Sequence, residues 1–198
     1  MWQFPGTRLR LASASERRLT LLRQIGLDPE VWPPHVDESV RAGEDPAAYV
    51  ARMALTKARA ALESGVDLVV GADTAVVCDL EILGKPSGPE EAARMLARLG
   101  GRDHCVMTGV AVCSPAEPAG RVRVVETMVR FKSLTPEEIH AYVATGEPLD
   151  KAGAYGIQGV GAFLVARVEG SYSGVVGLPI FETLELLRNF GLTFSGPE

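Results

Sequence analysis

The sequence lacks most features of secreted, membrane-bound or nucleic-acid-binding proteins. Its 198 residues include three cysteines, an odd number with no C-x-x-C pair, so a disulfide framework is not indicated. No apolar run reaches the ~18 residues of a membrane span, and the N-terminus MWQFPGTRLRLA has no apolar signal-peptide segment. The net charge of -5 argues against a broad basic face for nucleic acid or lipid. We therefore expect a cytoplasmic protein with reduced cysteines and no nucleic-acid or membrane partner.

Several common catalytic motifs are missing too. The sequence has no G-x-x-x-x-G-K-[ST] phosphate loop and no G-x-S-x-G serine-hydrolase motif, and GIQGVG at 156–161 does not have dinucleotide-binding spacing. The three histidines, His35, His104 and His140, show no metal-ligand spacing. We interpret all three as structural.

The remaining pattern alternates strands and helices. We expect extended segments over 8–12, 31–36, 66–77, 81–83, 105–113, 122–131 and 162–168. We expect helices over 16–25, 45–63, 89–99, 135–145 and 179–190. Hairpins and crossovers both occur, so the prediction is one α/β domain over 1–198 with a mixed sheet. The least regular stretches are 13–18, 84–88, 146–161 and 170–178, and such loops usually carry sites.

One carboxylate, Asp73, interrupts the apolar run DLVVGADTAVVCD. Burying an unpaired carboxylate costs several kcal/mol or shifts its pKa. We therefore expect Asp73 to be paired, to lie at a strand end beside a cleft, or to bind a cation.

The stretch LASASERR at 11–18 indicates an anion site. A strand ends, serines follow, and Arg17 and Arg18 fall in the first helical turn, where positive charge opposes the helix dipole. A phosphate bound by the helix N-terminus, Ser13 and the arginines would resolve that conflict. The alternative is that Ser15 is a simple N-cap and the arginines are solvated.

Three further motifs carry polar groups on loops. LGKP presents Lys85 in a tight loop, as a phosphate contact or as a plain surface turn. LDKAGAYGIQG at 149–159 offers the Gln158 amide to a flat polar ligand edge, or is only a glycine-rich connection. GSYSGVVGLP at 170–179 is another tight loop before a helix.

The remaining charged candidates lie at 37–38 and in the long helix. Asp37 and Glu38, in HVDES, would form with Asp73 a carboxylate cluster for a hard cation such as Mg²⁺, which takes one or two carboxylates plus substrate phosphates. A solvated turn is the alternative for HVDES, and a solvated helical lysine for Lys57. Together these charges suit a phosphorylated substrate attacked by a metal-associated water.

The motifs S-x-S-x-R-R, GADT, LGKP, DKAGAYGIQG and VVGLP, in this order over about 8–191, resemble the Maf family of nucleoside triphosphate pyrophosphatases. LDKAGAYGIQG is similar to the branch acting on dTTP and UTP. The resemblance implies hydrolysis of the α–β phosphoanhydride to nucleoside monophosphate and pyrophosphate, with Mg²⁺ or Mn²⁺, in the cytoplasm, often by a homodimer. It implies an elongated, ITPase-like α/β fold with a central mixed sheet flanked by helices and an active-site cleft between two lobes.

Carried over by motif, the resemblance makes Asp73 the proton acceptor and associates three residues with base specificity: Arg17, Thr74 and Gln158. The remaining pocket positions are Ser13, Arg18, Glu38, Lys57 and Lys85. In the mechanism that we expect, Glu38 helps Asp73 to hold the metal, and Lys85 with the arginines neutralises developing charge. Glu16 stands where the family usually has proline. Glutamate suits a first helical turn, but its charge near the phosphate path could lower affinity.

Two other functions use the same residues. A phosphatase or nucleotidyltransferase would release different products. A nucleotide-binding regulator, for example of cell division, would bind nucleotides with little turnover.

Overall fold

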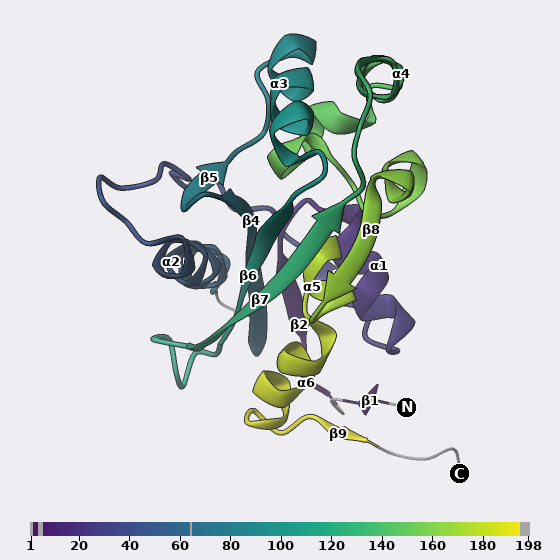
Figure 1. Cartoon of the computed structure of the whole chain (residues 1–198). Helices are drawn as coiled ribbons and strands as arrows, with labels where there is room; N and C mark the ends of the chain where they lie inside the picture. Colours follow the sequence, from purple (N-terminus) through teal and green to yellow (C-terminus); the bar gives the residue numbers. More distant parts are fainter. Residues whose placement is uncertain (1, 4–5, 64, 195–198) are drawn as a thin grey trace. The chain divides into compact units, whose positions relative to one another are not determined.

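A computed structural model describes residues 2–3, 6–63 and 65–194, which form an α/β fold (Figure 1). Seven strands make one mixed sheet in the order β3-β2-β4-β6-β7-β8, with β5 paired to β4. The strands are β2 (Leu9–Ala12), β3 (Glu30–Val31), β4 (Leu68–Cys78), β5 (Glu81–Leu83), β6 (Asp103–Cys113), β7 (Arg121–Phe131) and β8 (Val165–Glu169). β2 runs parallel to β3 and β4, whereas β5 is antiparallel to β4 and β8 to β7.

The remaining elements are helical, apart from a second, two-stranded sheet. The helices are α1 (Glu16–Gln24), α2 (Pro46–Ala60), α3 (Pro89–Leu99), α4 (Pro136–Ala144), the 3₁₀ segments η1 (Glu147–Asp150), η2 (Ala152–Ala154) and η3 (Gly159–Leu164), then α5 (Tyr172–Val176) and α6 (Ile180–Arg188). β1 (Trp2–Gln3) pairs with β9 (Thr193–Phe194). The chain divides into two compact units. Unit 1 holds 1–73, 108–125 and 177–198, and unit 2 holds 74–107 and 126–176.

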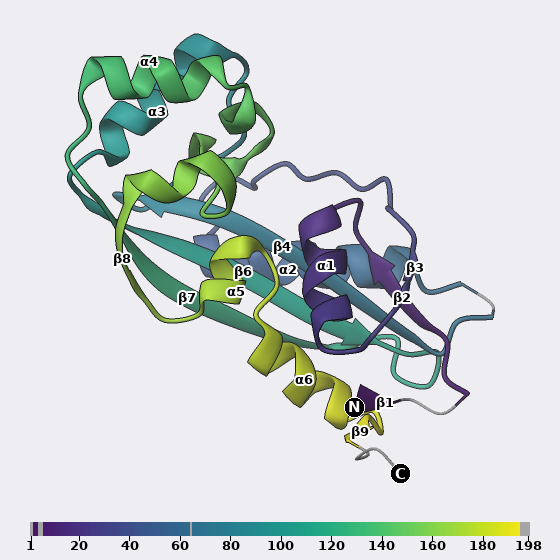
Figure 2. The same ribbon diagram turned by 90° about the vertical axis from the view of Figure 1, so that its right-hand side faces the viewer.

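In unit 1, α1 and α2 cover opposite faces of the sheet, as Figure 2 shows from the side of α1. Small residues line the contact between α2 and the sheet, including Ala54 and Ala58. A Cβ on Gly71 of β4 would lie 2.4 Å from the Ala54 carbonyl oxygen, and one on Gly109 of β6 would lie 2.3 Å from the Val50 carbonyl oxygen. Only glycine lets the helix backbone approach this closely. The close approach places the next turn of α2 over the middle of β4.

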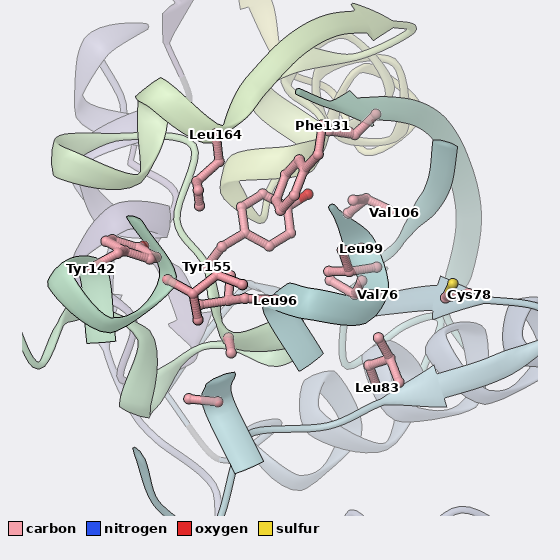
Figure 3. Packing of buried hydrophobic residues seen from close by; sticks show 14 residues of the cluster. Val76, Cys78, Leu83, Leu96, Leu99, Val106, Phe131, Tyr142, Tyr155 and Leu164 are labelled. Carbon is pink, nitrogen blue, oxygen red and sulfur yellow. The ribbon is translucent and has the colours of Figure 1, made fainter. Parts of the chain in front are cut away.

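Unit 2 has its own core, built by α3, α4 and the 3₁₀ segments on the sheet. Figure 3 shows Phe131 and Tyr155 at its centre, with Leu96, Leu99 and Leu164 around them. The Phe131 and Tyr155 rings meet edge to face at 4.7 Å between centroids, a preferred aromatic geometry. A capping box holds the start of α4, because Thr135 and Glu138 exchange hydrogen bonds at the first turn.

Most elements follow the sequence prediction. α3 spans the predicted 89–99, and β5 pairs back on β4 as expected. α2 is shorter than predicted and ends at Ala60. We expected an extended segment over 31–36, but the strand β3 spans only Glu30–Val31. Pro33 and Pro34 have no N–H to donate to a neighbouring strand.

Two predictions at the C-terminal side are wrong. Residues 162–164, expected in a strand, belong to η3, and only Val165–Glu169 is extended. The Glu147 carboxylate accepts hydrogen bonds from the backbone N–H groups of Val160 and Gly161, which keeps this segment wound. The stretch 170–178 was expected to be irregular but contains the short helix α5.

Candidate active site

The centre of the predicted site in unit 1 is a lysine between two carboxylates. Lys57 Nζ lies 2.7 Å from Asp73 Oδ1 and 2.9 Å from Glu38 Oε1. The side chains of Lys57 and Asp73 are only 10% and 9% exposed, whereas that of Glu38 is 56% exposed. A buried carboxylate thus has a buried counter-ion, as the cost of burying charge requires.

Asp73 is the sixth residue of the eleven-residue strand β4 and lies in its middle. The prediction that it lies at a strand end is therefore wrong, and the alternative that it is paired is confirmed. Gly71 and Asp73, two residues apart, point to the same face, which is covered by α2. Gly71 packs on Ala54, and Lys57 lies one turn after Ala54 in α2. It is not the solvated helical lysine that the sequence alone allowed.

The serine–arginine motif forms a connected group at the start of α1. Ser15 is the N-cap of α1 and accepts a hydrogen bond from the Arg18 backbone N–H. The Ser13 hydroxyl oxygen, 3.1 Å from Arg18 Nη1, also accepts from the Ser15 N–H at 3.2 Å. Arg18 Nε donates to the Gly177 carbonyl at 2.8 Å, which joins this motif to the VVGLP motif.

The two groups of unit 1 share one electrostatic environment. Burial lowers the pKa of the Arg18 guanidinium, although the negative charge of Asp73 opposes that shift. The charge of Arg17 lowers the pKa of Arg18 further, and that of Glu38 raises it. Arg17 and Arg18 are half-buried, and Ser13 is buried. Unit 1 therefore presents guanidinium groups, a helix N-terminus and two carboxylates, which suits a phosphate with an associated cation.

Three predicted site residues belong to unit 2: Thr74, Lys85 and Gln158. Thr74 follows Asp73 along β4 and is half-buried, and Lys85 and Gln158 are exposed. The Gly153 N–H donates to the Gly84 carbonyl at 3.1 Å, so the LGKP turn adjoins the LDKAGAYGIQG loop.

A single carboxylate orders the end of that loop. Glu147 Oε1 accepts hydrogen bonds from the Tyr142 hydroxyl and the Gly161 N–H, and Oε2 accepts one from the Val160 N–H. Burial alone would raise the pKa of Glu147, but these hydrogen bonds hold it below its usual value. The turn that begins directly after Gln158 is therefore fixed by a residue eleven positions upstream.

Sequence reasoning missed the residues that hold the segment carrying Glu38. The Tyr49 hydroxyl donates to the Glu38 carbonyl at 3.1 Å, and Arg52 Nη2 donates to the Ser39 carbonyl at 3.1 Å. Arg52 also forms a two-pronged ion pair with Glu44, at 2.5 and 2.6 Å. The signal was present in α2, where Tyr49 and Lys57 lie eight residues apart on one helical stripe.

The fit of a metal can be judged from the carboxylates. Among residues 2–3, 6–63 and 65–194, no group of three or more His, Cys, Asp or Glu side chains is placed to hold a metal ion. Two carboxylates, those of Glu38 and Asp73, approach the same ammonium group of Lys57. This donor set fits a hard cation that takes its other ligands from phosphates and water, as Mg²⁺ commonly does.

Comparison with known proteins decides the family. The family model described as "Maf-like protein" matches residues 8–190. The chain belongs to the Maf family. A relative from Moorella thermoacetica, named dTTP/UTP pyrophosphatase, is 56% identical over 96% of this chain and 98% of its own length. A relative of the same name from Anaeromyxobacter sp. is 57% identical over 93% of this chain and 90% of its own length.

The matched region, 8–190, coincides with the predicted motif-bearing region of about 8–191. The three cysteines are free, as expected. In the described residues, no helix is both long enough and apolar enough to span a membrane. A HAM1 protein from Coxiella burnetii superimposes with a TM-score of 0.46 at 16% identity over 63% of this chain and 73% of its own, so the family assignment rests on the sequence matches.

Proposed function

We propose that this protein is a nucleoside triphosphate pyrophosphatase that hydrolyses dTTP and UTP to the monophosphate and pyrophosphate. The observation that carries the proposal is the identity of 56% and 57% with two Maf proteins named dTTP/UTP pyrophosphatase. The charged group of unit 1 supports it, because its residues suit phosphate and a hard cation. The cell compartment we propose is the cytoplasm.

The chemical step is in-line attack of water on the α-phosphorus. Asp73 takes the proton of the attacking water, and Lys57 holds the Asp73 carboxylate in one orientation through the 2.7 Å ion pair. Glu38 and Asp73 are the residues that would hold Mg²⁺ or Mn²⁺. When bound, such a cation lowers the pKa of the water and neutralises phosphate charge.

The triphosphate contacts are proposed for the cationic residues. In unit 1 the start of α1, with Ser13, Arg17 and Arg18, offers N–H groups and guanidinium forks to phosphate oxygens. For Lys85 the role rests on the family motif LGKP, and we propose that it stabilises the charge on the leaving pyrophosphate.

Base selection is proposed for Gln158, with Arg17 and Thr74. Uracil and thymine share an acceptor, N3–H donor, acceptor edge, and one Gln amide pairs with the N3–H and one carbonyl. Cytosine lacks that N3–H and would leave a polar group without its partner, which discriminates strongly. The thymine methyl needs only space, so dTTP and UTP both fit, and modified pyrimidine nucleotides are the alternative physiological substrates.

The specificity proposal is tested by Gln158→Ala. We expect the ratio of kcat/KM for UTP over CTP to fall by at least tenfold, because the discriminating amide is lost. The matched control is Gln24→Ala, at the end of α1 in unit 1. If Gln158→Ala leaves the UTP:CTP preference as it is in the wild type, Gln158 does not read the base.

The activity itself is tested by product analysis. Purified protein with Mg²⁺ or Mn²⁺ is given each common nucleoside triphosphate, and the products are separated by anion exchange. Monophosphate and pyrophosphate from UTP and dTTP, with little from ATP, GTP or CTP, are expected. Diphosphate with phosphate would contradict the cleavage site. The homodimer typical of the family stays a prediction, tested by light scattering.

A further inference from the structure

The ion pair with Lys57 is not enough by itself to hold Glu38 in place. Its side chain is 56% exposed, yet its carboxylate must stay 2.9 Å from the buried ammonium of Lys57. An exposed ion pair normally contributes little free energy, because ordering two long side chains costs entropy. Residues 37–44 form neither helix nor strand, and the local bond that spans Glu38 runs from the Ser39 N–H to the Asp37 carboxylate at 2.9 Å.

Side chains of α2 supply the missing restraint. Tyr49 is buried and donates to the carbonyl of Glu38 itself, and Arg52 donates to the carbonyl of the next residue, Ser39. These two bonds hold successive peptide groups against the first turns of α2. Lys57 lies two turns further along the same helix and binds the Glu38 carboxylate.

Arg52 is itself held in place. Its guanidinium forms two hydrogen bonds with Glu44, at 2.5 and 2.6 Å, and the Glu44 side chain is 9% exposed. The same guanidinium stacks on the Tyr49 ring at 5.5 Å, a cation–π distance. Glu44 also accepts from the Arg41 N–H, which closes the segment at its other end.

We propose that Tyr49 and Arg52 are positioning residues that fix Glu38 at the catalytic centre. Neither touches the reacting atoms in this account; both act through the backbone of Glu38 and Ser39. The kinetic consequences of this proposal rest on the proposed function. Its structural part does not: it states only that Glu38, held by Tyr49 and Arg52, covers Lys57.

The structural part is tested without any nucleotide, by labelling lysines with an acetylating reagent and measuring each site by mass spectrometry. In Tyr49→Phe and Arg52→Lys, we expect Lys57 to be labelled several-fold faster than in the wild type. The rates at Lys85 and Lys132 should not change, and they serve as internal controls. An unchanged labelling rate of Lys57 in both variants would overturn the proposal, whether or not the protein hydrolyses nucleotides.

The kinetic part is tested by a double-mutant cycle with Glu38→Gln. Removing the Tyr49 hydroxyl should lower kcat/KM for UTP by roughly three- to tenfold, the value of one hydrogen bond. In the Glu38→Gln background, Tyr49→Phe should change kcat/KM by less than about twofold, because the residue it positions is already lost. Equal effects in both backgrounds would show a general structural role and contradict the proposal.

The matched control for Arg52→Lys is Arg121→Lys. Arg121 also forms a two-pronged pair with a glutamate of unit 1, Glu117, at 2.9 and 3.0 Å, although this pair is more exposed. Arg52→Lys should lower kcat/KM and raise the Mg²⁺ concentration needed for half-maximal rate, whereas Arg121→Lys should change neither. Equal changes in both variants would mean that any lost ion pair has this effect. If the wild-type protein turned over no nucleotide, the proposed function would be refuted. The labelling rate of Lys57 would then be the test of whether Tyr49 and Arg52 hold Glu38 in place.

Discussion

Asp73 and Lys57 form a buried ion pair with 2.7 Å between Lys57 Nζ and Asp73 Oδ1, so each buried charge has its counter-ion. A lone aspartate in an apolar strand requires a partner. The partner comes from a helix position that, by sequence, suits solvent equally well. The sequence around either residue therefore does not identify the other as its partner in the 2.7 Å contact.

The first residue-scale prediction concerns Asp73→Asn. We expect kcat for UTP to fall by about 10²–10⁴-fold, because the amide cannot accept the proton of the attacking water. The fold should persist, since Lys57 keeps Glu38 as a partner at 2.9 Å. Steady-state kinetics and thermal unfolding measure the two effects. The control is Asp79→Asn, an exposed carboxylate paired with Arg102, and near-wild-type turnover by Asp73→Asn would remove Asp73 as the base.

The second residue-scale prediction concerns the buried His104 in unit 2. Its Nε2 lies 2.8 Å from the Tyr155 hydroxyl oxygen, and burial lowers its pKa to about 4. In the unfolded chain the pKa is about 6.5, so below pH 6.5 the unfolded state binds a proton that the folded state does not. The free energy of unfolding should therefore fall as the pH drops from 6.5 to 4, by about 2 kcal/mol from this group.

The check is urea unfolding of wild type and His104→Gln at pH 7 and pH 4.5. The wild type should lose about 2 kcal/mol more than the variant over this interval. The matched control is His140→Gln, which changes an exposed histidine. Equal losses in wild type and His104→Gln would show that His104 is not held neutral by burial.

At the scale of elements, the contact between α2 and β4 controls where Lys57 lies. The prediction is that Gly71→Ala destabilises the fold by about 1–3 kcal/mol, because the added methyl meets backbone atoms of α2 that cannot turn away. Activity should fall as well, since α2 carries Lys57. Urea unfolding and UTP turnover measure both. In Gly84→Ala the added methyl enters open space, so stability should stay close to wild type, and equal stability of Gly71→Ala would contradict the close approach.

Elements with local signals were predictable from sequence. α3 begins with proline at its first position and ends before Gly100, and α4 has its capping box, so neither needs distant residues. η3 could not be predicted, because the mostly apolar stretch 162–168 is typical of a strand and the deciding hydrogen bonds come from Glu147. The pairing of β1 with β9 joins residues at opposite ends of the sequence and gives no local pattern.

At the scale of the whole molecule, the order of the motifs indicated the family, and the fold divides the motifs between two units. The anion motif, Glu38, Lys57 and Asp73 lie far apart in sequence but belong to unit 1, whereas the LGKP and LDKAGAYGIQG loops adjoin each other in unit 2. The types of the site residues were visible in the sequence. The sequence puts Tyr49 on the same stripe of α2 as Lys57, but the supporting roles of Tyr49, Arg52 and Glu147 depend on tertiary contacts.

In the proposed reaction, water attacks the α-phosphorus of a pyrimidine triphosphate beside Asp73. The most direct measurement is turnover of UTP in ¹⁸O-labelled water with Mg²⁺, followed by mass spectrometry of the products. We predict UMP with one ¹⁸O atom and unlabelled pyrophosphate, because the attacking oxygen stays on the phosphorus that it attacks. Label in pyrophosphate would place the attack on the β-phosphorus, and UDP with phosphate, or no turnover, would contradict the account.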